Sequence, residues 1–154
     1  MRSPGLIPRT DIRGGKGDAS TLYIDDSTAR PTTTGDQVLV RVRAFGLNRM
    51  DLLQREGRYP VPPQAPATLG VEFSGTIEHE GEVAGRGDDE RHHWKAGDEV
   101  FGLAYGGAYA EYIAVSRRML VRKPEELSWE VCAGVCEVSL CSRGWQVAAA
   151  RLAG

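Results

Sequence analysis

Apolar and polar positions alternate along several short segments of this 154-residue chain. In the segment 38–45, VLVRVRAF, Val38, Val40 and Val42 fall on one face and the intervening arginines fall on the other. A period of two is typical of a half-buried strand. The pattern therefore predicts a strand over 38–45 with one face in the core and the other in solvent.

The pattern changes in the segment 46–60, GLNRMDLLQREGRYP. Asn48 stands at an N-cap position, two adjacent leucines supply an apolar stripe, and Gly57 is a C-terminal stop signal. These signals predict a short helix over about 49–56. Four prolines at 60–66 then favour a stiff, extended loop, because proline supports neither a central strand nor a helix interior.

The remaining apolar segments are short and are separated by glycine-containing turns. Residues 1–20 are predicted to be irregular or, at most, a weak first strand, and Ser128 predicts the start of a final helix. Strands are expected at the apolar segments 69–79, 100–104, 108–115 and 119–124, after a first short run at 21–24. Many short strands at close spacing favour a small barrel or sandwich over a βαβ array.

The composition limits the classes of function. The 19 Lys and Arg nearly balance the 21 Asp and Glu, which excludes the strongly basic surface of a nucleic-acid-binding domain. The N-terminus is broken by prolines and glycines and fits neither a signal peptide nor a membrane span. All three cysteines lie within 132–141, so no disulfide framework spans the chain. We expect a cytoplasmic protein that binds neither nucleic acid nor a membrane.

Five segments form a recognisable set: VLVRVRAFGLNRMDLLQREGRYP, LGVEFSG, WKAGDEVFGL, GGAYAEY and PEELS. Their order and spacing resemble the N-terminal, GroES-like half of a quinone oxidoreductase. The branch is the zinc-free one, zeta-crystallin-like or p53-inducible quinone oxidoreductase-like, of the medium-chain dehydrogenase/reductase superfamily. The resemblance implies a mainly β fold with short helices (α+β), a partly open GroES-like barrel, over residues 21–137.

The resemblance also bears on whether a catalytic metal is expected. Metal-dependent relatives place a zinc-ligating cysteine at the position of Asn48 and a histidine at the position of Val71. Neither Asn nor Val supplies the thiolate or imidazole that zinc requires. The neighbouring His92 and His93 lie in a charged, glycine-punctuated segment with no third ligand at a suitable spacing. We therefore expect no metal.

The resemblance implies that NADPH is the cofactor and that a quinone or α,β-unsaturated carbonyl compound is the substrate. In the family, the position of Asn48 lies beside the nicotinamide end of the cofactor, and the position of Tyr59 lies near the substrate. Asn48 is thus the predicted cofactor-binding residue and Tyr59 the predicted catalytic residue. Local physics alone also allows simpler roles, in which Asn48 caps the helix and Tyr59 anchors the loop before Pro60.

Four other residues receive structural interpretations. We expect Asp51 to stabilise the first turn of its helix and Glu72 to pair within its strand. Cys132 and Cys136, four residues apart, are expected to be buried free thiols on one side of a helix.

The family's nucleotide-binding domain, a doubly wound α/β unit with a Gly-rich turn, finds no counterpart in this sequence. Residues 138–154 also resemble nothing in the family, and a retained intron or a frameshift would explain them. We expect an irregular segment 1–20, a GroES-like domain 21–137 and an unrelated tail 138–154. Such a truncated form would have little activity alone. The alternative is a non-catalytic GroES-like interaction module, or a fragment that modulates full-length subunits and self-associates through its exposed cleft face.

Overall fold

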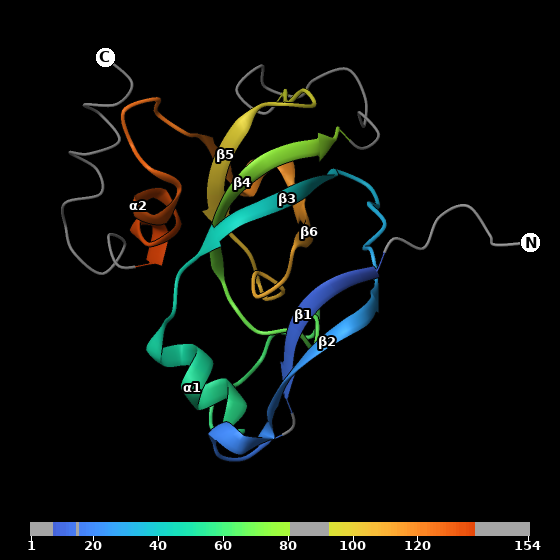
Figure 1. The fold of residues 1–154 in the computed structure, drawn as a ribbon, viewed down its shortest axis with the longest axis vertical. Coiled ribbons are helices and arrows are strands. Elements are labelled where there is room, and N and C mark those ends of the chain that lie inside the picture. The colour runs from blue at the N-terminus through green and yellow to red at the C-terminus, as the bar shows by residue number, and fades with distance from the viewer. Residues whose placement is uncertain (1–7, 15, 81–92, 138–154) are drawn as a thin grey trace, which may run out of the picture.

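The computed structural model describes residues 8–14, 16–80 and 93–137 (Figure 1). The strands are β1 (Pro8–Gly14), β2 (Leu22–Ala29), β3 (Gln37–Phe45), β4 (Glu72–His79), β5 (Glu99–Leu103), β6 (Tyr112–Ser116) and β7 (Leu120–Arg122). The helices are α1 (Arg49–Arg55) and α2 (Trp129–Ala133), with short 3-10 turns at Ala19–Thr21 and Arg117–Met119. No helix in these described ranges is long and apolar enough to cross a bilayer.

The strands form two antiparallel sheets. A five-stranded sheet has the order β6-β3-β4-β5-β7, and β1 pairs with β2 in a separate two-stranded sheet. In Figure 1, β1 and β2 lie beside the lower half of the molecule, with α1 at their lower end and α2 beside the larger sheet. This mostly β arrangement with short helices confirms the predicted fold class.

The core lies on one face of the larger sheet. Val38 and Val40 of β3 are fully buried, whereas Arg41 and Arg43 are exposed. The buried valines join a cluster whose other members come mainly from β4 to β7 (Phe73, Ile77, Trp94, Val100, Ala108, Ile113, Val115 and Leu120). The alternation predicted for β3 is therefore confirmed.

Two strands begin three or four residues later than the sequence predicts, because the preceding residues form paired loops instead. β4 begins at Glu72 and β6 at Tyr112. Backbone N–H groups of Ala108 and Tyr109 donate to the carbonyls of Gly70 and Leu69. Gly70 has φ +91°, a conformation that L side chains rarely adopt. These bonds pair the two loops with each other beside α1, outside the regular pairing of the strands.

Helix α1 agrees closely with the prediction. Asn48, with φ −120° and ψ 152°, precedes the first helical residue, and Gly57, with φ +73°, follows the last turn. An extended N-cap and a left-handed glycine just beyond the end are what these residue types favour. The helix therefore places Asn48 at its start, directly after β3, and Tyr59 just beyond its end.

Candidate functional site

The candidate site begins at the N-terminal end of α1. The backbone N–H of Asn48 donates to Oδ2 of Asp51 at 2.8 Å, and the N–H of Asp51 donates to the carbonyl of Asn48 at 3.1 Å. The acidic side chain thereby satisfies a backbone donor at the helix start. The role expected for Asp51 in the first turn is confirmed.

Asp51 also has a second role that the sequence did not indicate. It is 3% exposed, and its Oδ2 accepts a hydrogen bond from the Tyr109 hydroxyl at 2.7 Å. Burial raises the pKa of the Tyr109 phenol well above its ordinary value, and the bond to Asp51 raises it further. Tyr109 therefore stays protonated as a fixed donor, and its ring packs against Phe45 with centroids 4.6 Å apart.

Glu72 corrects one expectation from the sequence. Its backbone lies in β4, but its side chain, 1% exposed, forms no strand pair. Instead Oε1 accepts from Asn48 Nδ2 at 2.8 Å, and Oε2 accepts from the backbone N–H of Glu137 at 2.9 Å. Glu72 thus joins the start of α1 to the residues that follow α2.

Two glycines make room for these polar groups. A Cβ at Gly46 would lie 2.2 Å from Oε1 of Glu72, and a Cβ at Gly70 would lie 2.3 Å from Cδ1 of Tyr109. Both separations are far shorter than any ordinary contact, so a side chain at either place would displace Glu72 or Tyr109. The glycines are therefore part of the structure that holds the Asn48 side chain.

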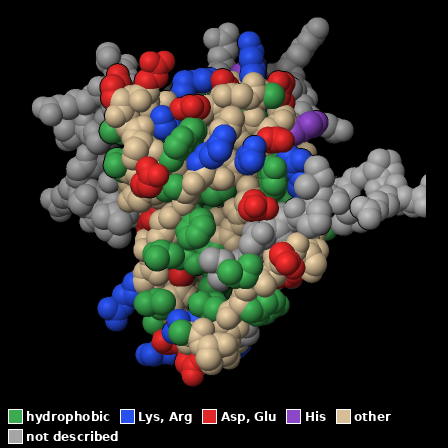
Figure 2. All heavy atoms as spheres, viewed as in Figure 1, with side chains coloured by type: hydrophobic (Ala, Val, Ile, Leu, Met, Phe, Trp, Pro, Cys, Tyr) green, Lys and Arg blue, Asp and Glu red, His purple; other side chains and the backbone are tan. Residues whose placement is uncertain are grey.

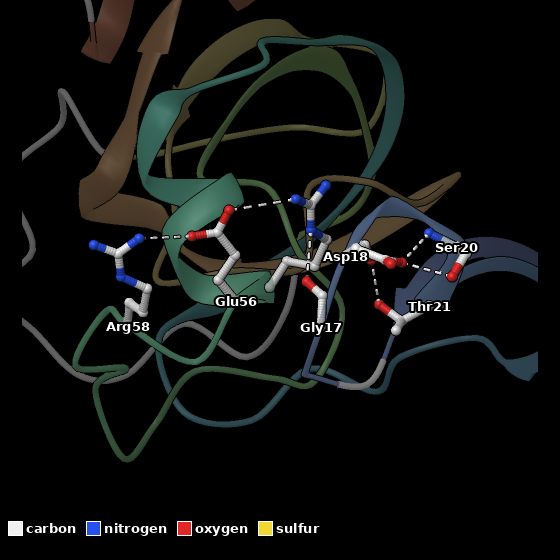
Figure 3. Close-up of polar contacts among 7 residues, drawn as sticks. Gly17, Asp18, Ser20, Thr21, Glu56 and Arg58 are labelled. Atoms are coloured by element: carbon white, nitrogen blue, oxygen red, sulfur yellow. Dashed lines mark hydrogen bonds and ion pairs between the residues drawn. The ribbon is translucent and has the colours of Figure 1, made fainter.

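The other end of α1 is held differently (Figure 3). The Gly17 N–H donates to the Arg55 carbonyl at 3.0 Å, and Arg55 Nε donates to the Gly17 carbonyl at 3.2 Å. Glu56 pairs with Arg55 at 3.6 Å and with Arg58 at 3.3 Å. Figure 3 shows the turn that joins β1 to β2 lying against this end of the helix, where Asp18 also binds Ser20.

Tyr59 lies in a bend after this end of α1 and is half-buried. The 7-residue helix separates it from Asn48, a length of about 10 Å at the α-helical rise. Within the described ranges, no hydrogen bond joins Tyr59 to Asn48, Asp51 or Glu72. The structure thus brings Asn48, Asp51, Glu72 and Tyr109 together and leaves Tyr59 apart from them.

Apolar side chains surround the start of α1. Leu47, next to Asn48, is 79% exposed, and Phe45 and Leu52 are also exposed. Figure 2 shows hydrophobic side chains gathered over the lower part of the molecule, where α1 and the β1–β2 pair lie. The polar Asn48 amide therefore stands beside accessible apolar surface.

Two hollows in the surface of the described residues lie away from the start of α1. One, of about 440 Å³, lies along β6 and the loop after β5, and another, of about 530 Å³, lies beside Leu39 and His79. Asn48 and Tyr59 line neither of them.

The cysteines agree with their structural interpretation. Cys132 and Cys136 are buried free thiols, as predicted, and burial raises the pKa of Cys136 to about 12. His93 is exposed, and His92 lies outside the described residues. No three His, Cys, Asp or Glu side chains within residues 8–14, 16–80 and 93–137 cluster in a way that could hold a metal ion.

Comparison with known proteins identifies the class. The family model for the alcohol dehydrogenase GroES-like domain matches residues 34–125, and the chain belongs to that family. The predicted resemblance to the N-terminal part of medium-chain quinone oxidoreductases is thereby confirmed.

Individual relatives agree with this class. The chain is 33% identical to a synaptic vesicle membrane protein VAT-1 homolog of Danio rerio over 82% of its length, covering 25% of the relative. It is 32% identical to a quinone oxidoreductase of Lama guanicoe over 77% of its length, covering 34% of the relative. The Escherichia coli quinone oxidoreductase complexed with NADPH matches with a TM-score of 0.67 and 27% identity, over 81% of this chain and 36% of that one. The chain spans about a quarter to a third of these curated relatives.

The sequence reasoning missed Tyr109 and undervalued Glu72. Tyr109 lies in GGAYAEY, one of the segments that carried the resemblance, but its alternating pattern indicated only a strand. Glu72 lies in LGVEFSG, where an acid within an apolar run was itself the available signal, because an acidic side chain is seldom fully buried without polar partners.

Proposed function

We propose that this chain supplies the substrate-side domain of a metal-free, NADPH-dependent reductase of quinones or α,β-unsaturated carbonyl compounds, working in the cytoplasm. The observation that carries the proposal is the Asn48 amide, fixed by Glu72 at the start of α1 and flanked by exposed Leu47. A quinone and a nicotinamide are both flat rings that carry carbonyl groups. Exposed apolar carbon beside one amide suits such ligands.

The residues present fit the nicotinamide end of the cofactor. Asn48 Nδ2 carries two N–H groups, and Glu72 accepts from it, which leaves a second N–H for a carbonyl oxygen. NADPH, when bound, supplies a hydride. Asn48 would hold a carbonyl group in place and stabilise negative charge developing on its oxygen, while Leu47 and Phe45 would keep water away from one face of the ring.

Tyr59 is proposed to contact the substrate from the other end of α1. Its place in a bend after the helix leaves its phenol free of the Asp51 and Glu72 network, so it is available for a ligand. Tyr109 is excluded from this role because it is buried and already donates to Asp51.

The pyrophosphate and adenine ends of NADPH need a different partner. The described strands are paired antiparallel and include no strand, Gly-rich turn and helix of the dinucleotide-binding kind. We therefore expect the chain alone to bind NADPH weakly, and to contact only the nicotinamide end.

A non-catalytic interaction module is the second candidate. The observation in its favour is the set of exposed apolar side chains at the start of α1, including Leu47 and Leu52, because an accessible apolar patch also suits a protein partner.

Titration of the ¹⁵N-labelled chain with 1,2-naphthoquinone, followed by backbone amide chemical shifts, tests the proposal. We expect shifts at Leu47, Asn48 and Tyr59, and loss of the response in Asn48→Ala. Shifts confined to the hollow along β6, at Tyr105 and Ala114, would contradict it. NADPH should give only small shifts at the same amides, and saturable micromolar NADPH binding would show that the chain holds more of the cofactor site than proposed.

A further inference from the structure

We propose that Glu72 is a positioning residue that holds the Asn48 amide in one orientation, so that Asn48 presents an N–H, and not its oxygen, to the carbonyl oxygen of a ligand. The nature of the ligand rests on the proposed function. The orientation of the amide follows from the contacts of Glu72 and does not depend on that function.

The direction of the amide is set by the chemistry of its neighbour. An asparagine side chain has a donor end and an acceptor end of nearly the same shape, so its orientation must come from hydrogen-bond partners. A carboxylate only accepts. Oε1 of Glu72 lies 2.8 Å from Asn48 Nδ2, and the reversed amide would bring two oxygens together at that distance.

Glu72 is itself held, which makes it a fixed reference for Asn48. Its second oxygen accepts from the Glu137 N–H at 2.9 Å, and the side chain is almost fully buried. The lack of a side chain at Gly46 lets Oε1 reach this place, since a Cβ there would lie 2.2 Å from it. The carboxylate can therefore neither rotate nor withdraw without losing a buried bond.

Replacing Glu72 by glutamine keeps the size of the side chain but leaves one acceptor oxygen where the carboxylate has two. A glutamine has one oxygen, and it faces two donors, Asn48 Nδ2 and the Glu137 N–H. If its oxygen serves Glu137, its NH₂ group faces Asn48 and favours the reversed Asn48 amide. Glu72→Gln should thus release or reverse Asn48 while leaving the space filled.

An exchange of the two groups separates positioning from simple stability. In the double variant Asn48→Asp with Glu72→Gln, the new glutamine donates to the new carboxylate, so a hydrogen bond between the two positions is restored. The ligand then meets only acceptor oxygens. The proposal predicts that the double variant is more stable than Asn48→Asp alone but does not bind a carbonyl ligand.

The experiment uses the full 154-residue chain and three readouts: side-chain NH₂ signals of Asn48 by NMR, urea unfolding, and the dissociation constant for 1,2-naphthoquinone. We expect Glu72→Gln to shift the Asn48 NH₂ signals, speed their exchange with water, and weaken quinone binding about tenfold, as for one lost hydrogen bond. Glu125→Gln, which changes an exposed glutamate, is the matched control and should alter none of the three.

The outcomes distinguish this inference from the proposed function. Unchanged Asn48 NH₂ signals in Glu72→Gln overturn the positioning role. So does a double variant that binds quinone as well as the unmodified chain does. If the unmodified chain shows no quinone response, the proposed function fails, and the NH₂ signals still decide whether Glu72 orients Asn48.

Discussion

The two ends of α1 are held by different kinds of interaction. At the N-terminal end, the Asp51 and Glu72 carboxylates are buried. Asp51 accepts from the hydroxyl of Tyr109, in the loop before β6, at 2.7 Å, and Glu72 accepts from the N–H of Glu137, after α2, at 2.9 Å. At the C-terminal end, Gly17 and Arg55 exchange two hydrogen bonds, and Glu56 pairs with Arg55 and with Arg58, whose side chain is 73% exposed. Buried, directional bonds fix a geometry, whereas exposed ion pairs contribute little because water and salt screen them.

This difference separates the two predicted site residues. Asn48 lies at the end held by buried carboxylates, and Tyr59 follows the end held by Gly17 and by partly exposed ion pairs. A donor that must meet a carbonyl oxygen within a few tenths of an ångström gains from a fixed frame. A side chain that contacts the rest of a substrate tolerates more freedom.

The largest effect is expected from Asp51→Ala. The change leaves the Tyr109 hydroxyl and the Asn48 backbone N–H without their acceptor. One buried and one partly buried donor left unsatisfied should lower the free energy of unfolding by about 3 kcal/mol. Urea unfolding followed by circular dichroism measures this value.

Asp18→Ala is the matched control for that variant. Asp18 accepts from Ser20 in the turn beside the other end of α1, where its partners are exposed. Its removal should have a much smaller effect than the removal of Asp51. Equal losses for the two variants would show that the two ends of α1 do not differ as described.

The second effect concerns the glycine that accommodates Tyr109. Gly70 and Gly97 have nearly the same φ, +91° and +93°, but only at Gly70 would a Cβ meet another atom, Cδ1 of Tyr109 at 2.3 Å. Gly97→Ala should lower stability by about 1 kcal/mol through backbone strain alone. Gly70→Ala should lower it by about 1 kcal/mol more, because Tyr109 must move. Thermal unfolding of the pair measures the difference, and equal values would contradict the packing role of Gly70.

Much of the fold was predictable from local pattern. The alternation in β3 predicted a half-buried strand because buried valines and exposed arginines leave a period of two in the sequence. Asn48 and Gly57 marked α1 to within about one residue because both ends depend on backbone conformations that few residue types favour. These signals are local, so a single sequence carries them.

The candidate site was predictable only in part, because its partners are far apart in the chain. Asn48 and Glu72 are 24 residues apart, and Tyr109 and Asp51 are 58 apart. Nothing local in GGAYAEY distinguishes a buried tyrosine that donates to an acid from a tyrosine that only alternates with its neighbours along a strand. The family resemblance drew attention to Asn48 and Tyr59, but the contacts that hold Asn48 appear only in three dimensions.

The third effect is a pH dependence confined to the buried end. Unfolded tyrosine loses its proton near pH 10, whereas burial keeps Tyr109 protonated in the fold, with its pKa raised. Above about pH 10 the unfolded state therefore binds fewer protons than the folded state, and stability falls as the pH rises. Tyr109→Phe should lower the free energy of unfolding by about 1 kcal/mol at pH 7. The decline of that free energy above pH 10 should be shallower in the variant.

Tyr23→Phe provides the comparison for this pH dependence, because Tyr23 is exposed on β2. It should leave both the stability at pH 7 and the decline at high pH nearly unchanged. Urea midpoints measured from pH 7 to pH 11 test both variants. A Tyr109→Phe curve parallel to that of the unmodified chain would show that Tyr109 titrates normally in the fold.

The smallest effect is expected at the exposed end, from Arg58→Ala. This change removes the pair with Glu56 at 3.3 Å and should lower stability by no more than about 0.5 kcal/mol, less at high salt. Its measurable consequence should instead lie at Tyr59, the next residue, because a weaker tether widens the range of positions that the following bend can adopt. We expect the Tyr59 backbone amide to exchange faster with water while the amides of Asn48 and Asp51 are unaffected. Faster exchange at Asn48 as well would mean that the two ends of α1 are coupled, and that the precision of the first depends on the second.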